Sequence, residues 1–332
     1  MVSTRLVARA RVWVDPFVVC LLGVLVIGLV VPFGAGARHG VGVASDVAVV
    51  LLFLLYGARL PAREVLAGLR HWRLQASIVG ATFVLFPVLG LVTRPLAEPW
   101  LGEGLALGLL YVCLLPSTVQ SSVAMVSMAR GNVAGAICGA TVSNLLGMLV
   151  TPLLVLWLMS DVAAGPTGAA TVGFGRIGNV LLTLLLPFVV GQVVQRWVGG
   201  WVRAHRPLTL AVDRGTILLV VLGAVASATA AGTWAGLTAW TIVSLVGVCA
   251  VVLAVVLAAT WWGGRALGLS RADRVALLHC GSTKSLATGL PMAAVLLPAA
   301  VLGGVVVPVV VFHQLELTVC SVLARRQALR PD

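Results

Sequence analysis

Charge is scarce in this sequence. Charged residues make up 10% of the 332 residues, and only ten residues are acidic. Soluble domains carry about 25% charged residues, because their surface faces water. Together with 60% apolar residues and a mean hydropathy of +1.11, this scarcity excludes a soluble globular domain. The composition predicts a protein that crosses a membrane many times.

Sequence motifs of several kinds of chemistry are absent too. No nucleotide-binding loop, zinc-binding helix motif or nucleophile elbow occurs, which argues against ATP-driven transport and hydrolysis. The basic residues lie in short groups rather than in one stripe, so nucleic acid is not an expected partner. The six cysteines have no metal-ligand spacing and are expected to be buried apolar side chains. Only Glu316 is acidic at the expected membrane depth, so paired carboxylates are lacking and we predict no enzymatic activity and no metal site.

Ten apolar segments approach the roughly twenty residues that cross a bilayer as a helix. They lie at 17–33, 44–60, 74–92, 104–128, 132–158, 172–196, 210–231, 238–262, 273–298 and 302–324. With the N-terminus in the cytoplasm, eighteen arginines fall on the cytoplasmic side and three, Arg38, Arg94 and Arg176, outside. This bias follows the positive-inside rule. It predicts a multi-pass protein of the plasma membrane with both termini cytoplasmic.

Five segments in each half require the second half to be inserted upside down relative to the first. The sequence therefore predicts an all-α membrane protein of ten helices, built as two inverted five-helix repeats, 1–165 and 166–332. Polar clusters interrupt the fourth segment of each half, at 116–122 and 280–285. Because unpaired backbone groups are costly in hydrocarbon, such interruptions favour a binding site lined by broken helices.

The fifth segment of each half carries a further polar pair, so that four helices offer polar groups at comparable depth. Pro116 removes a backbone donor and breaks the helix, which exposes free backbone groups to a ligand. Hydroxyl and amide groups between membrane helices also serve packing alone, and that alternative stays open. The candidate substrate residues are Pro116, Ser117, Thr118, Gln120, Ser143, Asn144, Ser285, His313, Gln314 and Glu316.

Several separated motifs carry a resemblance that covers nearly the whole chain. They are 115–122, 129–132, 143–147, 213–215, 280–286, 289–292 and 312–314. In this order they resemble the SBF-like branch of the bile acid:sodium symporter family, which includes many bacterial proteins and the vertebrate member numbered seven. The resemblance implies a panel of segments 1, 2, 6 and 7 and a core of segments 3–5 and 8–10. The broken fourth and ninth helices cross in the core.

The resemblance also implies sites. Ions would bind around the crossing, and an organic anion would bind between panel and core. The residues carried over to the ion region are Ser121, Ser122, Asn132, Ser282, Thr283 and Lys284. His279, the approximate counterpart of an acidic residue in sodium-coupled relatives, is assigned to the same region. Sodium-coupled relatives have an acidic residue and a Gln-Asn pair where this chain has His279, Thr283 and Lys284. A missing carboxylate and an added lysine argue against a sodium site, because hard cations need oxygen ligands.

Lys284, the only lysine, lies inside the ninth segment, where insertion costs about 2.5 to 3.5 kcal/mol. Three interpretations follow: a structural cation held by carbonyls of the broken helix or by Glu316, a substitute for sodium or a proton-exchanging group, and an anion contact. Glu316 belongs either to an ion path or to the cytoplasmic interface. His279 is expected to form a hydrogen bond at the helix break rather than to bind a metal.

These observations predict a secondary transporter of a small organic anion or sterol-like substrate that works by alternating access in the lipid bilayer. No cofactor is expected beyond Na⁺ or H⁺ as a coupling ion. The alternative is a membrane regulator of calcium homeostasis with little or no solute flux, a role that the vertebrate member of the branch suggests. The sequence leaves the oligomeric state open and is compatible with a monomer.

Overall fold

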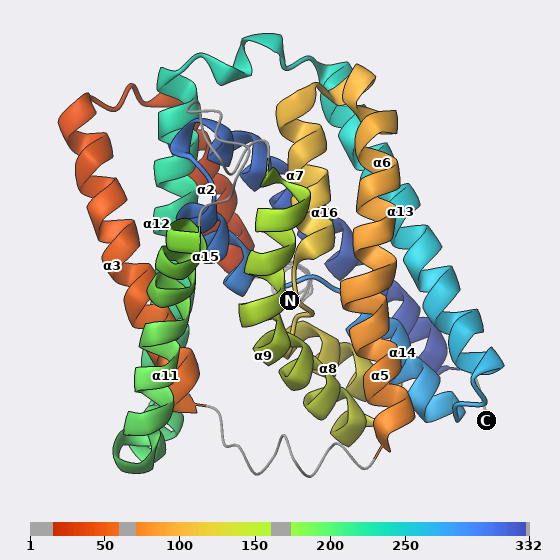
Figure 1. Cartoon of the computed structure of the whole chain (residues 1–332). Coiled ribbons are helices and arrows are strands. Elements are labelled where there is room, and N and C mark those ends of the chain that lie inside the picture. Colours follow the sequence, from red (N-terminus) through yellow and green to blue (C-terminus); the bar gives the residue numbers. More distant parts are fainter. Residues whose placement is uncertain (1–15, 60–70, 161–173, 330–332) are drawn as a thin grey trace, which may run out of the picture.

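The computed structural model describes residues 16–59, 71–160 and 174–329, and all regular structure within these ranges is helical (Figure 1). This confirms the all-α prediction for the described residues. The proposed boundary between the repeats, at 165 and 166, and the N-terminal residues lie outside them.

Fifteen helical elements follow one another along the chain. They are α2 (Pro16–Val30), α3 (Ala35–Arg59), α5 (Trp72–Gly80), the π-helical η2 (Ala81–Leu85), α6 (Phe86–Leu101), α7 (Glu103–Leu114), α8 (Gln120–Met128), α9 (Val133–Leu158), α11 (Phe174–Ala204), α12 (Arg206–Ala230), the 3-10 helix η3 (Thr233–Gly236), α13 (Ala239–Ala266), α14 (Arg271–Ser282), α15 (Leu286–Leu296) and α16 (Ala299–Ala328).

Seven stretches among the described residues are long and apolar enough to cross a membrane, with α5, η2 and α6 forming one of them. The other three predicted segments correspond to shorter helices. The first is α2, with 15 residues. The fourth and ninth are divided into α7 with α8 and α14 with α15, so that each part is shorter than the roughly 20 residues that span a bilayer. Length and composition therefore establish a multi-pass helical protein but not ten spans.

Helix boundaries depart from the apolar segments mainly at polar ends. The segment predicted at 44–60 begins at Ala35 in α3, because Arg38 and His39 are helical although they lower the local hydropathy. Similarly, α6 continues to Leu101 and α11 to Ala204. Hydropathy locates the apolar part of a helix, whereas backbone hydrogen bonding carries the helix on into polar residues.

Helices α2, α3, α11 and α12 pack on one another, and the remaining helices form a second, larger group (Figure 1). The tightest contact joins α3 to α11. A Cβ atom added at Gly57 would lie 2.1 Å from the carbonyl oxygen of Phe188, and one at Gly191 would lie 2.1 Å from that of Leu54. Only glycine permits this approach, so the two helices form a closely packed pair.

The second group holds most of the buried side chains. Helix α7 lies inside this group, and all ten residues from Leu105 to Leu114 are buried. Its neighbours are α6 on one side and α16 on the other. Large apolar side chains such as Val30, Trp157 and Trp262 are exposed on the outer helices, as expected for surfaces that face lipid. The expectation that all cysteines are buried is wrong for Cys20, which is exposed on α2 among the described residues.

Candidate functional site

The two interruptions of the helices are in direct contact. Residues 115–119 separate α7 from α8, and residues 283–285 separate α14 from α15. The backbone N–H of Ser285 donates to the carbonyl oxygen of Pro116 at 2.8 Å, and Ser117 Oγ donates to the carbonyl oxygen of Cys280 at 2.5 Å. We call this contact the crossing. It joins segments more than 160 residues apart in the chain.

Local sequence explains why each helix stops there. Pro116 has no backbone N–H, and Leu115 before it adopts an extended conformation, as residues before proline prefer. On the other side, the Ser285 side chain accepts a hydrogen bond from the Thr288 N–H and caps the start of α15. Both breaks are therefore built from ordinary terminating and capping residues.

Hydroxyl groups fill the space within the crossing. The Oγ atom of Ser122 lies 2.7 Å from Oγ1 of Thr283, and Ser117 Oγ lies 3.4 Å from the same atom. Ser143 on α9 accepts from the Ser117 N–H at 3.1 Å. These four side chains are fully buried, so the network shields backbone groups that the helix breaks leave unpaired.

Lys284 is buried beside this network and is 2% exposed. Its ammonium nitrogen donates to the carbonyl oxygens of Thr82, Cys113 and Leu115 at 3.1, 3.1 and 2.6 Å. It also lies 3.9 Å from the centre of the Phe86 ring, where a cation is attracted to the π-face. All three donors of the ammonium are thus satisfied by backbone oxygens.

These carbonyl oxygens are available for identifiable reasons. Cys113 and Leu115 lie at the C-terminal end of α7, where carbonyls lack intrahelical partners and the helix dipole is negative. Thr82 lies in η2. In an α-helix its carbonyl oxygen would accept from the Phe86 N–H, but here that N–H donates to the carbonyl oxygen of Ala81. The next residue, Pro87, has no N–H to continue the π-helical pattern, which leaves the Thr82 oxygen for Lys284.

Glu316 contacts the backbone of Lys284 rather than its ammonium group. The Lys284 N–H donates to Oε2 of Glu316 at 2.7 Å, while Oε1 lies 2.8 Å from Nδ1 of His313. Glu316 is fully buried and contacts the second break. Of the two structural partners foreseen for the ammonium, the carbonyls of the broken helix hold it and Glu316 does not.

A cavity of about 300 Å³ borders the crossing. One wall comes from α3, α11 and α12, and the other from residues 118–120, α9 and α15. Among the candidate substrate residues, those that line it are Thr118, Gln120, Asn144 and Ser285. The crossing and the cavity therefore share residues, which places a small-molecule-sized space against the helix breaks.

Arg59 and Asp213 face each other across one wall of the cavity. The guanidinium group donates three hydrogen bonds of 3.0, 3.1 and 3.1 Å to the carboxylate, and both side chains are partly buried. Nearby, the Tyr56 hydroxyl donates to the carbonyl oxygen of Ala287 at 3.5 Å. Sequence reasoning missed Arg59, Asp213 and Tyr56 as site residues. Opposite charges at the edges of segments 44–60 and 210–231 were the available signal.

Several polar atoms of the cavity have no hydrogen-bond partner among the described residues. They are Arg59 Nε, Thr118 Oγ1, Asn144 Oδ1 and Thr288 Oγ1. A buried polar atom without a partner costs about 1–3 kcal/mol, and a ligand that pairs with it recovers this energy. The cavity therefore offers both donors and acceptors to a polar ligand.

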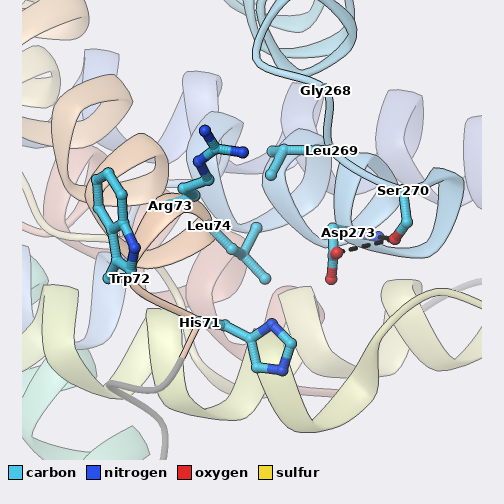
Figure 2. Close-up of a pocket in the computed structure, with 8 residues that line it drawn as sticks. All are labelled: His71, Trp72, Arg73, Leu74, Gly268, Leu269, Ser270 and Asp273. Atoms are coloured by element: carbon cyan, nitrogen blue, oxygen red, sulfur yellow. Dashed lines mark hydrogen bonds between the residues drawn. The ribbon is translucent and has the colours of Figure 1, made fainter.

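Other candidate residues lie apart from the crossing. Asn132 caps α9 and donates to Oδ1 of Asp273 at 2.7 Å, at the far end of α14. Figure 2 shows Asp273 with Ser270 at a separate pocket of about 240 Å³, which His71 and Trp72 also line. Because α14 runs from Arg271 to Ser282, about 15 Å of helix separates Asn132's partner from Thr283.

The remaining candidates lie on α14, α8 and α16. His279 is buried and points toward α16, where its Nε2 lies 3.1 Å from Oε1 of Gln327. Ser282 Oγ donates to the carbonyl oxygen of Leu278 at 2.5 Å. Ser121 Oγ is buried without a partner among the described residues. Gln314 is partly buried on α16 beside His313.

Comparison with known proteins identifies the family. Residues 15–328 match the SBF-like CPA transporter family. The chain belongs to this family. It is 42% identical over 325 residues to an uncharacterized protein of Pseudomonas aeruginosa, covering 98% of this chain and 96% of the relative.

Two further relatives carry transport names. The protein named "Putative symporter YfeH" of Escherichia coli K12 is 39% identical over 312 residues, covering 94% of this chain and 92% of its own. The mouse protein named "Sodium/bile acid cotransporter 7" is 27% identical over 325 residues, covering 96% of this chain and 93% of its own. Family membership supports a transport role for this membrane protein and gives no support to an enzymatic one.

Proposed function

We propose that this protein is a secondary active transporter that moves a small organic anion across the membrane by alternating access. The observation that carries the proposal is the polar cavity between the two helix groups, with the crossing as part of its wall. Among the described residues, its polar atoms without a hydrogen-bond partner include the guanidinium nitrogen Arg59 Nε, which suits an anion. A carboxylate or sulfonate of limited size fits a cavity of about 300 Å³.

In this proposal the helices divide into a panel and a core. The panel consists of α2, α3, α11 and α12, and the core contains the remaining helices. The helix pairs α7–α8 and α14–α15 each complete one crossing of the bilayer, which with α2 gives ten spans in two inverted repeats. Movement of the panel against the core then opens the cavity to each side in turn.

Coupling follows from Lys284. Its side-chain nitrogen is bound by three carbonyl oxygens and lies over one aromatic face, which is the environment of a cation. A monovalent metal ion prefers the same kind of oxygen ligands, so the lysine occupies the coordination that a sodium ion would need. We therefore expect transport that does not require sodium, with a proton or the substrate gradient as the remaining driving force.

Uptake into liposomes tests this proposal. Purified protein should accumulate a labelled carboxylate or sulfonate under an imposed proton gradient, equally well with sodium and with potassium outside. The variant Asn144→Leu should abolish uptake, because it fills the cavity and removes a polar partner. Thr318→Leu, an exposed position on α16, serves as the matched control and should transport normally.

The alternative role gives a different result in the same assay. A membrane regulator without flux would bind organic anions and show no uptake under any gradient. A strict requirement for sodium in the parent protein would contradict the coupling proposed for Lys284 while leaving the transport function standing.

A further inference from the structure

A third and larger cavity lies among helices of the core. It measures about 580 Å³ and is lined by α13, α14 and α16. Its inner wall is apolar and includes Leu257, Leu278, Val319 and Leu323. Nothing in the proposed transport cycle uses this space.

One end of the cavity is strongly basic. Three arginines line it, and no Asp or Glu occurs among its described lining residues. The Arg274 guanidinium lies 4.0 Å from the centre of the Trp261 ring, and its Nε donates to the Trp261 carbonyl oxygen at 3.4 Å. Arg271 donates to the carbonyl oxygen of Gln327 at 2.9 Å, while Arg326 is exposed. Two of the three cations are thus held in place by the protein.

Tryptophans lie at the same end. Trp261 and Trp262 both line the cavity, and Trp262 is 65% exposed. Tryptophan is enriched where hydrocarbon meets the headgroups of a bilayer, and arginine there contacts phosphate. The basic end therefore has the composition of a headgroup level, and the apolar wall begins directly beside it.

We propose that this cavity binds an anionic phospholipid. The phosphate contacts Arg271, Arg274 and Arg326, and an acyl chain lies along Leu257, Leu278 and Leu323. A zwitterionic lipid is disfavoured because its ammonium group would approach the same three arginines. A free phosphate would leave the apolar wall unfilled, so the hydrophobic contribution to binding would be lost.

Such a lipid would brace α14 against α16. Gln327 at the cavity accepts from Arg271 through its carbonyl oxygen, and its side chain contacts His279 on α14. The backbone carbonyl oxygen of His279 accepts a hydrogen bond from the Thr283 hydroxyl at the second break. Lipid bound here therefore stabilises the folded arrangement of the helix that leads into the crossing.

Thermal unfolding of the detergent-purified protein tests the proposal. Phosphatidylglycerol should raise the Tm of the parent protein by about 3 °C, whereas phosphatidylcholine with the same acyl chains and inorganic phosphate alone should not. The double variant Arg274→Gln/Arg326→Gln should lose most of this shift. Arg265→Gln, at an exposed arginine in the last turn of α13 that does not line the cavity, should keep it.

Native mass spectrometry gives a second readout. The parent and Arg265→Gln should retain one phosphatidylglycerol more readily than the double variant does. If the double variant does not fold, Arg326→Gln alone replaces it, because that side chain is exposed. Equal shifts with phosphatidylglycerol and phosphatidylcholine, a shift with phosphate alone, or an unchanged shift in the arginine variant would each overturn the proposal.

Discussion

The crossing and the cavity beside it differ in how many of their polar groups are hydrogen-bonded. At the crossing, Lys284 has three carbonyl partners and Ser117 bonds across to Cys280. In the cavity, Thr118 Oγ1 and Asn144 Oδ1 have no partner among the described residues. Ser117 and Thr118 are neighbours in the chain, so the change from paired to unpaired occurs within one residue. Paired groups stabilise the fold, whereas unpaired groups remain available to a ligand. Substitutions in the two regions should therefore separate stability from transport.

Substitution of Lys284 is expected to cause the largest losses of stability and uptake. The variant Lys284→Met keeps the apolar stem but leaves three buried carbonyl oxygens without their donor. Removing one partner of a buried charged interaction costs about 3–5 kcal/mol, so Tm should fall sharply and uptake should be lost. Thermal unfolding and liposome uptake measure the two effects. In Lys284→Asn, sodium should restore part of the lost Tm, whereas potassium should not. An unchanged Tm in Lys284→Met would show that the carbonyls do not depend on the ammonium.

Substitution of Arg59 is expected to weaken the apparent affinity for substrate. Arg59→Gln removes the cation of the cavity, so KM for an anionic substrate should rise by about tenfold or more, because charge-assisted hydrogen bonds are the strong ones. The loss of stability should be smaller than for Lys284→Met, since the side chain is 27% exposed. Asp213→Asn is the control that keeps the guanidinium and removes its competing carboxylate, and it should lower KM. Equal KM values in all three proteins would place anion binding elsewhere.

Ser117→Ala should affect stability more than transport affinity. The change removes the hydrogen bond to Cys280, which leaves a buried carbonyl oxygen without that donor. We expect a loss of about 1–2 kcal/mol, measured as a lower Tm, with KM changed less than twofold. A larger change in KM than in Tm would mean that Ser117 contacts the substrate directly.

Thr118→Val should show the reverse pattern and the smallest effect. Valine has nearly the shape of threonine and removes a hydroxyl that has no partner among the described residues, so Tm should stay the same or rise slightly. Uptake measurements should show KM raised about threefold to tenfold, the value of one hydrogen bond to substrate. A fall in Tm like that of Ser117→Ala would remove the distinction between the two regions.

Much of the fold follows from composition and periodic interruptions. Apolar segments located the helices, although α3, α6 and α11 extend well beyond them, and the polar clusters at 116–122 and 280–285 marked both helix breaks. The contacts that hold Lys284 could not be predicted in detail, because their acceptors are backbone oxygens that every residue carries. Thr82 becomes an acceptor only through the π-helical turn before Pro87, which is a feature of backbone geometry.

The pairing of side chains from distant helices could not be predicted from the sequence either. The resemblance assigned Asn132 to the ion region, and the structure shows that it caps α9 and contacts Asp273 in the first turn of α14. Arg59 and Asp213 are 154 residues apart, and only the packing of α3 on α12 brings them together.

The sequence by itself determined that this chain is a membrane protein, that two of its helices are broken and that its only lysine lies inside one of the apolar segments. These follow from hydropathy and from residues that cannot continue a helix. The tertiary structure decided that the breaks bond to each other, that Lys284 is held by carbonyl oxygens rather than by Glu316, and that the polar cavity opens beside them. Those outcomes depend on which distant helices pack together, and no local pattern of residues encodes that choice.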